Sequence, residues 1–464
     1  MICSIYGKPV TRICTIGGKL LSKACRIDGS GIAVQETDGA YYVGDSYAFS
    51  EMTMADPNGI SVVSDAHTRR AASTVLLTAN GSAATVSFDC EIPMDNMPNV
   101  GVWLWTDRLT KGGYDQTVNS HECQIEITIG STTKKFSGKS NDASLKSGMN
   151  YYMFTRNEVG TDTINQITVR VTGASGGVFY LDSVEVGFRM VTPHVLLNLD
   201  SSGKNFYSVG YPLFKKYGLT ATFDYNISND DVSIGASSGT WADAEDAKKH
   251  FEMVEDGFDY GSYSGWVDNE GIRPTSMDDE AFYDIWLDHG RRMFALNNCY
   301  GIYAPSTVHC TAFKSGETYQ KAMVGAGFLC VRTDAKYLKS GATYLNEFSY
   351  FDGSDYREIT PYYLGDCWDA DSGQIAAAKQ VLSHCVRTGQ NCMIMMHTIR
   401  ERGYDHSANT LDVGYDAIEE LLKTIKEYVD AGKLKCSTTA GLVKEVAPGV
   451  HAEWYENRKQ STVF

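Results

Sequence analysis

One strand-length segment near the middle of the chain constrains its fold more than any other. Residues 194–199 are mostly apolar, Asp200 follows them, and the segment breaks at Gly203. In α/β barrels and doubly wound sheets, reacting groups gather where a strand ends and a loop begins. Asp200 therefore stands where such a group is expected. The next residue is Ser201, and a serine binds a hard or borderline cation less well than a carboxylate does.

Strands and amphipathic helices alternate from Pro193 onward, which is typical of a parallel sheet. Two helices are well marked. Ser372 can cap the first, which carries one apolar stripe and ends at Gly389, and the second ends before Gly432. We predict strands at 194–200, 219–225, 258–263, 293–303, 327–333 and 391–397, and helices at 209–217, 241–256, 277–290, 316–325, 373–388 and 415–431.

Residues 35–190 follow a different pattern, in which short segments of alternating apolar and polar residues are separated by Gly, Asn and Ser. That pattern predicts an all-β sandwich. The closing segment 178–186 resembles the last strand of jelly-roll carbohydrate-binding modules. Trp103, Trp105 and Tyr114 could stack on sugar rings, although aromatic side chains of a sandwich belong to its core about twice as often.

The N-terminal residues carry an internal repeat. Cys3, Cys14 and Cys25 each begin the pattern Cys-x-Ile-x-Gly, at a period of 11 residues. Apolar residues two apart lie on one face of a strand and each glycine permits a tight turn, so we predict three short strands. A sheet this small buries too little surface to stand alone. We expect residues 1–31 to dock on another copy of the chain or on a larger assembly; docking on their own domain is the equal alternative.

Composition excludes several classes of partner. The net charge is -16, with acidic and basic residues interspersed, which argues against binding to nucleic acid or to an anionic membrane. The twelve cysteines form no Cys-x-x-Cys pair, so we expect no structural zinc site and a reducing compartment of synthesis. The N-terminus lacks an apolar signal core and no apolar run is long enough to span a bilayer. We therefore expect synthesis in the cytoplasm without membrane insertion.

The order of motifs over residues 193–447 resembles the polysaccharide deacetylase family with the NodB-type fold. The resemblance implies a (β/α) barrel, and it places the family's catalytic base at Asp200 and its catalytic acid at His397. The segments that carry the resemblance are 199–201, 212–218, 221–225, 257–263, 302–305, 395–397 and 432–439.

The family's metal ligands are not matched. In that family an aspartate and two histidines hold the metal, and the resemblance places these ligands at Ser201, Tyr263 and Val267. The family's arginine falls at Tyr303. Such a metal activates water and polarises the amide carbonyl, so its loss predicts a barrel without deacetylase activity.

Other residues at the same predicted edge offer two further interpretations. Asp224 and Asp259, together with Asp200 and His397, could bind a divalent cation. Alternatively, Asp224 and Asp259 are hydrogen-bonded groups of the loops at this edge. We favour that interpretation and expect no cofactor. Aromatic side chains near this edge would suit a glycan, whose ring faces stack while its hydroxyls bond to carboxylates. The substrate-binding residues that we predict are Tyr263, Trp266, Tyr303, Trp368 and Asp369, with Tyr362 nearby.

These expectations describe a multidomain protein with a docking arm at 1–34, an all-β jelly-roll sandwich at 35–190, a deacetylase-like (β/α) barrel at 193–447 and an irregular tail at 448–464. We favour recognition of cell-surface polysaccharide by an inactive barrel. The layout resembles a phage tail or baseplate adsorption protein, which is carried on the virion. Residues 1–31 would then bind a virion component or another copy of the chain. Two alternatives stay open: an active deacetylase or hydrolase with an unorthodox site, and a purely structural virion protein.

Overall fold

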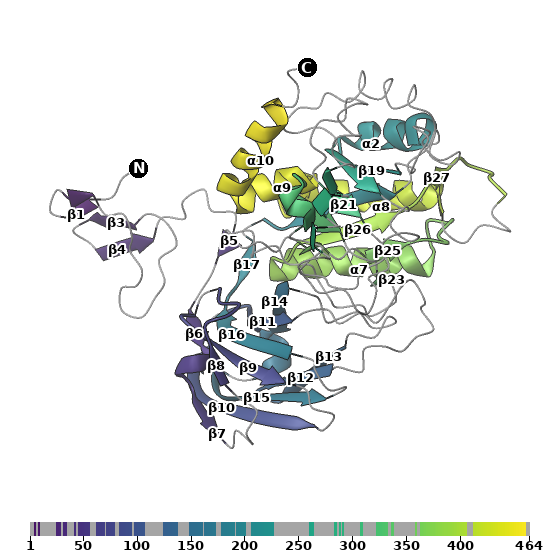
Figure 1. Ribbon diagram of the computed structural model, residues 1–464. Coiled ribbons are helices and arrows are strands. Elements are labelled where there is room, and N and C mark those ends of the chain that lie inside the picture. The colour runs from purple at the N-terminus through teal and green to yellow at the C-terminus, as the bar shows by residue number, and fades with distance from the viewer. Residues whose placement is uncertain are drawn as a thin grey trace. The chain divides into compact units, whose positions relative to one another are not determined.

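The computed structural model divides the chain into two compact units (Figure 1). The first comprises residues 1–106, 123–136 and 149–191, and the second comprises residues 107–122, 137–148 and 192–464. The structure describes residues 4–5, 8–9, 25–28, 31–34, 41–42, 45–55, 62–69, 71–78, 83–94, 97–106, 124–137, 148–160, 162–172, 178–190, 192–200, 206–226, 259–263, 283–284, 287–288, 290–291, 307–309, 322–332, 336–337, 358–359, 362–405 and 412–460.

Two antiparallel sheets form the body of the first unit (Figure 1). The eight strands β9 to β16 run β9-β16-β11-β14 in one sheet and β10-β15-β12-β13 in the other, which is the strand order of a jelly roll. The predicted all-β sandwich is therefore confirmed. The strands are β6 (Ser46–Ala48), β7 (Thr53–Ala55), β8 (Val62–Ser64), β9 (Thr74–Thr78), β10 (Ala84–Pro93), β11 (Asn99–Thr106), β12 (Gln124–Ile129), β13 (Thr132–Ser137), β14 (Gly148–Thr155), β15 (Thr163–Thr172) and β16 (Val178–Val186), while β5 (Tyr41–Tyr42) pairs with β17 (Arg189–Met190).

The sandwich strands form because apolar residues recur at every second position. On β10, Val86, Phe88 and Ile92 are buried, whereas Thr85 and Asp89 are exposed. Since successive side chains of a strand point to opposite faces, one face of this sheet builds the core and the other meets solvent.

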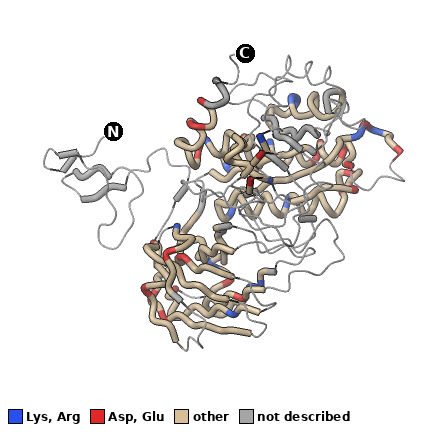
Figure 2. The backbone as a smooth tube through the Cα atoms, viewed as in Figure 1, with Lys and Arg blue, Asp and Glu red and all other residues tan. Residues whose placement is uncertain are grey.

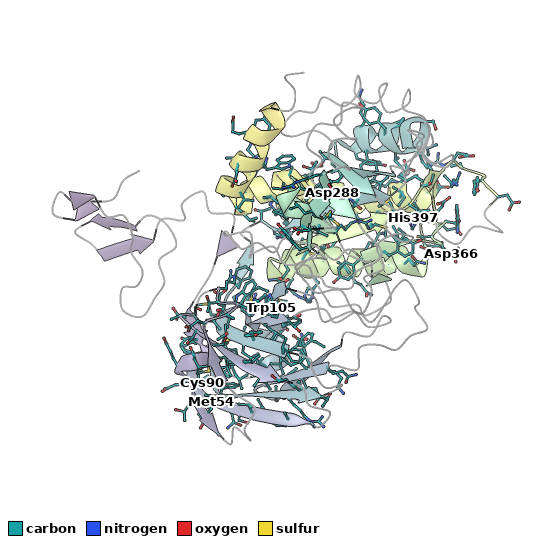
Figure 3. The ribbon with its side chains drawn as sticks, viewed as in Figure 1. Met54, Cys90, Trp105, Asp288, Asp366 and His397 are labelled. Carbon is teal, nitrogen blue, oxygen red and sulfur yellow. The ribbon has the colours of Figure 1, made fainter. Side chains whose placement is uncertain are left out.

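The two tryptophans of β11 belong to the packed interior. Trp103 is 0% exposed and Trp105 is 4% exposed. The ring of His67 stacks on Trp105 with a centroid distance of 3.5 Å. Neither indole therefore presents an open face to a sugar ring, and Figure 3 shows Trp105 among the other side chains of the sandwich. The structure agrees with the core interpretation of these residues, while Tyr114 lies outside the described residues.

A buried ion pair holds the loop that precedes β9. Arg69 Nη1 lies 3.2 Å from Glu185 Oε1, and the two side chains are 3% and 0% exposed. The Arg69 guanidinium also lies 3.5 Å from the ring centroid of Trp103, whose Nε1 donates to Glu185 Oε2 at 2.8 Å. Asp182 accepts the backbone N–H groups of Arg69 and Ala71. Two buried carboxylates of β16 thus determine the course of this loop.

A ten-stranded sheet forms the centre of the second unit (Figure 1). Its order is β23-β25-β26-β18-β19-β20-β21-β22-β24, β29 also pairs with β18, and these pairings are parallel. The parallel α/β organisation is confirmed, but no pairing among the described strands closes the sheet into the predicted barrel. The strands are β18 (His194–Asp200), β19 (Thr222–Asn226), β20 (Asp259–Tyr263), β21 (Thr307–His309), β22 (Cys330–Arg332), β23 (Lys336–Tyr337), β24 (Glu358–Ile359), β25 (Tyr362–Leu364), β26 (Cys392–Met396) and β29 (Lys435–Ser437), while β27 (Ile399–Arg400) pairs with β28 (Val413–Gly414).

The two helices that the sequence marks most strongly cover this sheet. Ser372 Oγ accepts the N–H of Ile375 at 3.3 Å at the start of α7, and Gly389 ends that helix with a φ of 71°. Both predicted ends of α7 are therefore confirmed. The apolar stripes of α7 and α8 share one core with Leu197 and Ile394 of the sheet. The helices are η1 (Phe49–Glu51), α1 (Arg156–Val159), η3 (Phe206–Gly210), α2 (Tyr211–Tyr217), α7 (Gly373–Thr388), α8 (Tyr415–Asp430), α9 (Thr439–Val446) and α10 (Pro448–Gln460).

The C-terminal segment corrects one prediction. The sequence analysis predicts an irregular tail at 448–464, but α10 runs from Pro448 to Gln460. A proline in the first turn of a helix forgoes no hydrogen bond, because the N–H groups there have no partner within the helix. Trp454, which is 5% exposed, anchors this helix.

The N-terminal repeat forms hairpins where it is described. β1 (Ser4–Ile5) pairs with β2 (Lys8–Pro9), and β3 (Cys25–Asp28) pairs with β4 (Gly31–Val34). The first and third copies of the repeat thus each contribute the first strand of a hairpin. The second copy and the predicted elements at 241–256 and 293–303 lie outside the described residues.

The described surface carries both signs of charge. Figure 2 shows Lys and Arg positions interspersed with Asp and Glu positions along the described backbone. Of the helices that the structure describes, none is long and apolar enough to cross a membrane.

A buried histidine ties the start of β18 to α9. His194 Nδ1 lies 2.7 Å from Ser437 Oγ, and its Nε2 lies 3.2 Å from Glu445 Oε2. Burial lowers the pKa of His194 below its ordinary value. Burial alone would raise the pKa of Glu445, but hydrogen bonds from His194 and Lys435 outweigh it and lower that pKa to about 2.

We expect acid to destabilise the second unit through this pair. The pKa of His194 is lower in the folded protein than in the unfolded chain. Its contribution to stability is therefore complete above pH 6.5 and is lost as the pH falls below that value, because the unfolded chain then binds more protons. The depressed pKa of Glu445 adds a loss that begins below its ordinary value of 4.5 and ends near pH 2. The free energy of unfolding, measured against pH, should therefore fall on acidification from pH 7. The Glu445→Gln variant should lose the part of the slope below pH 4.5, and a flat wild-type profile would contradict the assignment.

Candidate functional site

The parallel register brings three predicted site positions to one edge of the sheet. Asp200 pairs with Asp224, and Asp224 pairs in turn with Gly261 of β20. β26 pairs with β18 as far as Met396, so His397 follows at the same edge. In α/β folds, ligands bind outside the carboxyl ends of the strands. Positions 200, 224 and 397 therefore form the candidate site that the topology defines.

Asp259 does not share this edge. It is the first residue of β20 and pairs with Thr222, the first residue of β19, so the prediction that Asp259 lies at the same edge as Asp200 is wrong. Tyr263 ends β20 and pairs with His309 of β21. The strand boundary is weakly marked in the sequence, because residues 257–263 hold two glycines and no β-branched residue.

His397 is hydrogen-bonded to a tyrosine of the neighbouring strand. Its Nδ1 lies 3.1 Å from the hydroxyl oxygen of Tyr363, and the two rings meet edge to face with a centroid distance of 5.2 Å. The imidazole is half-buried, whereas the Tyr363 side chain is buried. Tyr362, the residue named from the sequence, belongs instead to the core beneath the helices. Alternation along β25 places Tyr363 on the opposite face from Tyr362 and Leu364.

Gly365 provides the space for the Tyr363 phenol. A Cβ at position 365 would overlap the Tyr363 ring and hydroxyl oxygen. The Gly365 N–H donates to Gln374 Oε1 at 3.2 Å, so the backbone here is attached to α7.

We expect Gly365→Ala to displace the Tyr363 side chain and to break its hydrogen bond with His397. Overpacking of this kind costs about 1–3 kcal/mol of folding free energy. The change should appear as a shift of the His397 ring resonances in NMR spectra. Gly373→Ala is a matched control, because a Cβ at position 373 meets nothing within 4 Å. Unchanged His397 resonances in Gly365→Ala would contradict the arrangement.

A pair of stacked aromatic rings, which we call the aromatic shelf, lies in the loops that follow β25 and β26. Trp368 and Tyr404 stack with a centroid distance of 5.9 Å and an interplanar angle of 17°. Both side chains are half-buried. Trp368 Nε1 donates to Asp366 Oδ1 at 3.0 Å, and the Arg400 guanidinium lies 4.7 Å from the Tyr404 ring centroid. Figure 3 shows Asp366 and His397 in the same region of the second unit.

Backbone contacts hold the shelf in place. The Gly414 N–H donates to the Cys367 carbonyl at 2.8 Å, and a Cβ at position 414 would lie 2.5 Å from the Trp368 carbonyl oxygen. Asp366 has a positive φ of 50°, a conformation that aspartate tolerates better than most residues. Arg400 Nε donates to Asp412 Oδ2 at 2.6 Å, which joins the end of β27 to the residue before β28. Only glycine fits at position 414 without moving Trp368.

The structure places some of the predicted site residues and does not describe others. Trp368 belongs to the aromatic shelf. Asp369 is exposed, and its carbonyl accepts the N–H of Ser372 at 3.1 Å, which makes it part of the turn before α7. For Asp200, Asp224 and Tyr263 the structure describes the backbone position. Ser201, Trp266, Val267 and Tyr303 lie outside the described residues.

The positions that the family resemblance assigns to metal ligands carry no aspartate or histidine. A hydroxyl, a phenol and an alkyl group at Ser201, Tyr263 and Val267 cannot replace an aspartate and two histidines. Within the described part of the chain, no group of three or more His, Cys, Asp or Glu side chains could hold an ion.

The sequence analysis did not predict three residues that lie at or near this edge. β25 has only three residues, so its sequence pattern does not show which of its two tyrosines faces His397. Tyr404 follows no sequence motif, and only the loop geometry brings it to Trp368. Arg332 ends β22, pairs with His309 in register and is fully buried. A charged residue at the end of the predicted strand 327–333 is a signal that could have singled it out.

Comparisons with known proteins give no assignment by sequence, because no family model and no curated protein matches this chain. Among solved structures, the T48 deacetylase with substrate covers 56% of this chain and 92% of its own, at 13% identity and a TM-score of 0.27. The peptidoglycan deacetylase PdaC from Bacillus subtilis covers 58% and 98%, at 14% identity and a TM-score of 0.25. The module TmCBM61 in complex with beta-1,4-galactotriose covers 30% and 88%, at 14% identity and a TM-score of 0.21. With TM-scores below 0.5, these similarities do not establish the fold or the activity of this chain.

Proposed function

We propose that the protein recognises a cell-surface glycan at the carboxyl edge of its parallel sheet. The observation that carries the proposal is the aromatic shelf, a half-buried pair of parallel rings with Asp366 and Arg400 beside it. Flat apolar rings bind the apolar face of a sugar, and charged groups at their rim bind its hydroxyls. His397, from the same loop region, adds a further hydrogen-bonding group.

In this proposal the protein binds the glycan without metal-dependent deacetylation. The donor set at Ser201, Tyr263 and Val267 supports recognition without hydrolysis, because an amide carbonyl is a poor electrophile when no metal polarises it. Incubation of the full chain with acetylated peptidoglycan should release no acetate. Acetate release that a chelator abolishes would contradict this proposal and favour an active deacetylase.

We expect Trp368→Ala to weaken glycan binding by about two- to tenfold, since one aromatic stacking contact is worth about 0.5–1.5 kcal/mol. Isothermal titration calorimetry with soluble peptidoglycan fragments and N-acetylglucosamine oligomers would measure the effect. Tyr404→Phe keeps the stacked ring and should bind like the wild type. Tyr455→Ala on α10 is the control for loss of an aromatic side chain elsewhere. Equal affinities of Trp368→Ala and the wild type would place the glycan away from the shelf.

An active hydrolase remains the second candidate, and the His397–Tyr363 hydrogen bond favours it. Such a pair can hold an imidazole in one orientation for proton transfer. Acetate or reducing-sugar release that persists with a chelator and is lost in His397→Gln would support this candidate over recognition alone.

The N-terminal hairpins are the proposed docking element of a virion tail or of a self-assembled oligomer. Two short hairpins at 4–9 and 25–34 support this role, because so small a sheet needs a partner to bury surface. Sedimentation of the full chain should show an oligomer, or a complex with a virion component. Ile27→Asp should dissociate it, and an unchanged monomer in both proteins would favour docking on the chain's own first unit.

A further inference from the structure

Three asparagine side chains are buried in the described residues, and one of them differs from the others. Both amide atoms of Asn99 are hydrogen-bonded within the sandwich. Asn391 Oδ1 accepts the backbone N–H of His194 at 2.8 Å. Asn198 is 0% exposed, yet neither its Nδ2 nor its Oδ1 has a hydrogen-bond partner. A polar group in this state is unfavourable unless something else satisfies it.

The neighbours of Asn198 explain why its amide is unsatisfied. Asn198 lies in the middle of β18, in register with Thr222 of β19 and Met395 of β26. Leu199 belongs to the core beneath the helices, so Asn198 lies on the opposite face of the sheet. Thr222 Oγ1 accepts the N–H of Thr439 at 3.3 Å and lies 3.4 Å from Thr439 Oγ1, so both its acceptor and its donor have a partner. Met395 offers only a weak sulfur acceptor.

The position of Asn198 connects it to the candidate site. It lies two residues before Asp200 on the same face of β18, directly inward from the carboxyl edge. A leucine would suit this buried position better on packing grounds. A buried polar side chain that the protein itself does not satisfy often marks a functional position.

We propose that Asn198 binds an ordered water molecule inside the sheet, and that this water forms the floor of the glycan site. Its second part rests on the proposed function, whereas its first part does not. The chemistry of the amide selects the ligand, because both a donor and an acceptor need a partner. A bare cation would satisfy only Oδ1 and an anion only Nδ2, while water satisfies both and keeps further bonds for a neighbour.

A crystal structure of the full chain tests the first part directly. We expect an ordered water within hydrogen-bond distance of the Asn198 amide, with a second bond toward the edge at position 200. An amide bonded to protein groups alone, or a dry contact with Met395, would overturn the proposal.

A matched pair of variants tests the same inference in solution. Asn198→Leu should leave the melting temperature unchanged or raise it by up to about 4 °C, because leucine displaces the water and fills an apolar position. Asn391→Leu should lower the melting temperature, because it leaves the His194 N–H buried without its acceptor. A comparable loss of stability in both variants would show that Asn198 is bonded within the protein and would overturn the inference, whatever the protein binds.

The glycan titration then tests the second part. Asn198→Leu should weaken binding of the peptidoglycan fragments at least threefold while the protein stays folded. An unchanged affinity would overturn the role of the water in the site. If the wild type binds none of the glycans, the proposed function fails, whereas the water site still stands on the crystal structure and the melting temperatures.

Discussion

Replacing Glu185 by alanine should lower the free energy of unfolding of the sandwich unit by about 3–5 kcal/mol. The substitution leaves the Arg69 guanidinium, which is 3% exposed, buried without its nearest carboxylate. It also removes the acceptor of the Trp103 indole N–H. The loss is large because a buried charge deprived of its partner keeps its full desolvation penalty.

Hydrogen exchange of the β11 and β16 amides is the suitable measurement, because it reports on the sandwich separately from the second unit. Glu126→Ala is the matched control. Its carboxylate lies 3.0 Å from Arg170 and 2.7 Å from Lys135, whose side chains are 45% and 53% exposed. Exposed pairs of this kind contribute about 0–1 kcal/mol. Equal effects of the two variants would mean that the Arg69–Glu185 pair is solvated in solution.

Ile394→Ala should lower the stability of the second unit by about 2–5 kcal/mol, the range for truncating a large buried aliphatic side chain. Ile394 is fully buried in the core that β26 shares with α7 and α8. Because His397 follows β26 directly, a cavity beneath this strand should also loosen the His397–Tyr363 hydrogen bond.

The effect should appear as faster hydrogen exchange in β18 and β26 and as weaker glycan binding. Lys423→Ala on the exposed side of α8 is the control, and surface changes of this kind stay within about 0.5 kcal/mol. If Ile394→Ala destabilises the unit but leaves glycan affinity unchanged, binding does not depend on the position of β26.

Local sequence signals predicted the ends and faces of the long helices correctly. The hydrogen bond from the Ile375 N–H to Ser372 Oγ spans three residues, and the left-handed conformation of Gly389 needs only the residue itself. The alternation on β10 likewise follows from the period of a strand. Such features are encoded within a few positions of each other, so no knowledge of the rest of the fold is needed.

The errors arose where the signal was short or ambiguous. β25 has three residues, too few for its period to show that Tyr363 rather than Tyr362 reaches His397. The tail after Pro448 forms a helix, and proline is favourable in its first turn.

Trp103 could be interpreted in two ways from the sequence, and the core was the favoured one. The placement of Arg69 and Glu185 around its ring agrees with the core.

The amino-acid sequence by itself determined the change from an alternating β pattern to strands and helices after Pro193, together with the caps and apolar faces of α7 and α8. Only the tertiary structure decided that Asp200 pairs with Asp224, that His397 meets Tyr363, and that His194 contacts Ser437 across 243 residues of chain. The physical reason is that parallel strands are joined by long crossovers, so their register depends on packing of the whole sheet rather than on any local turn.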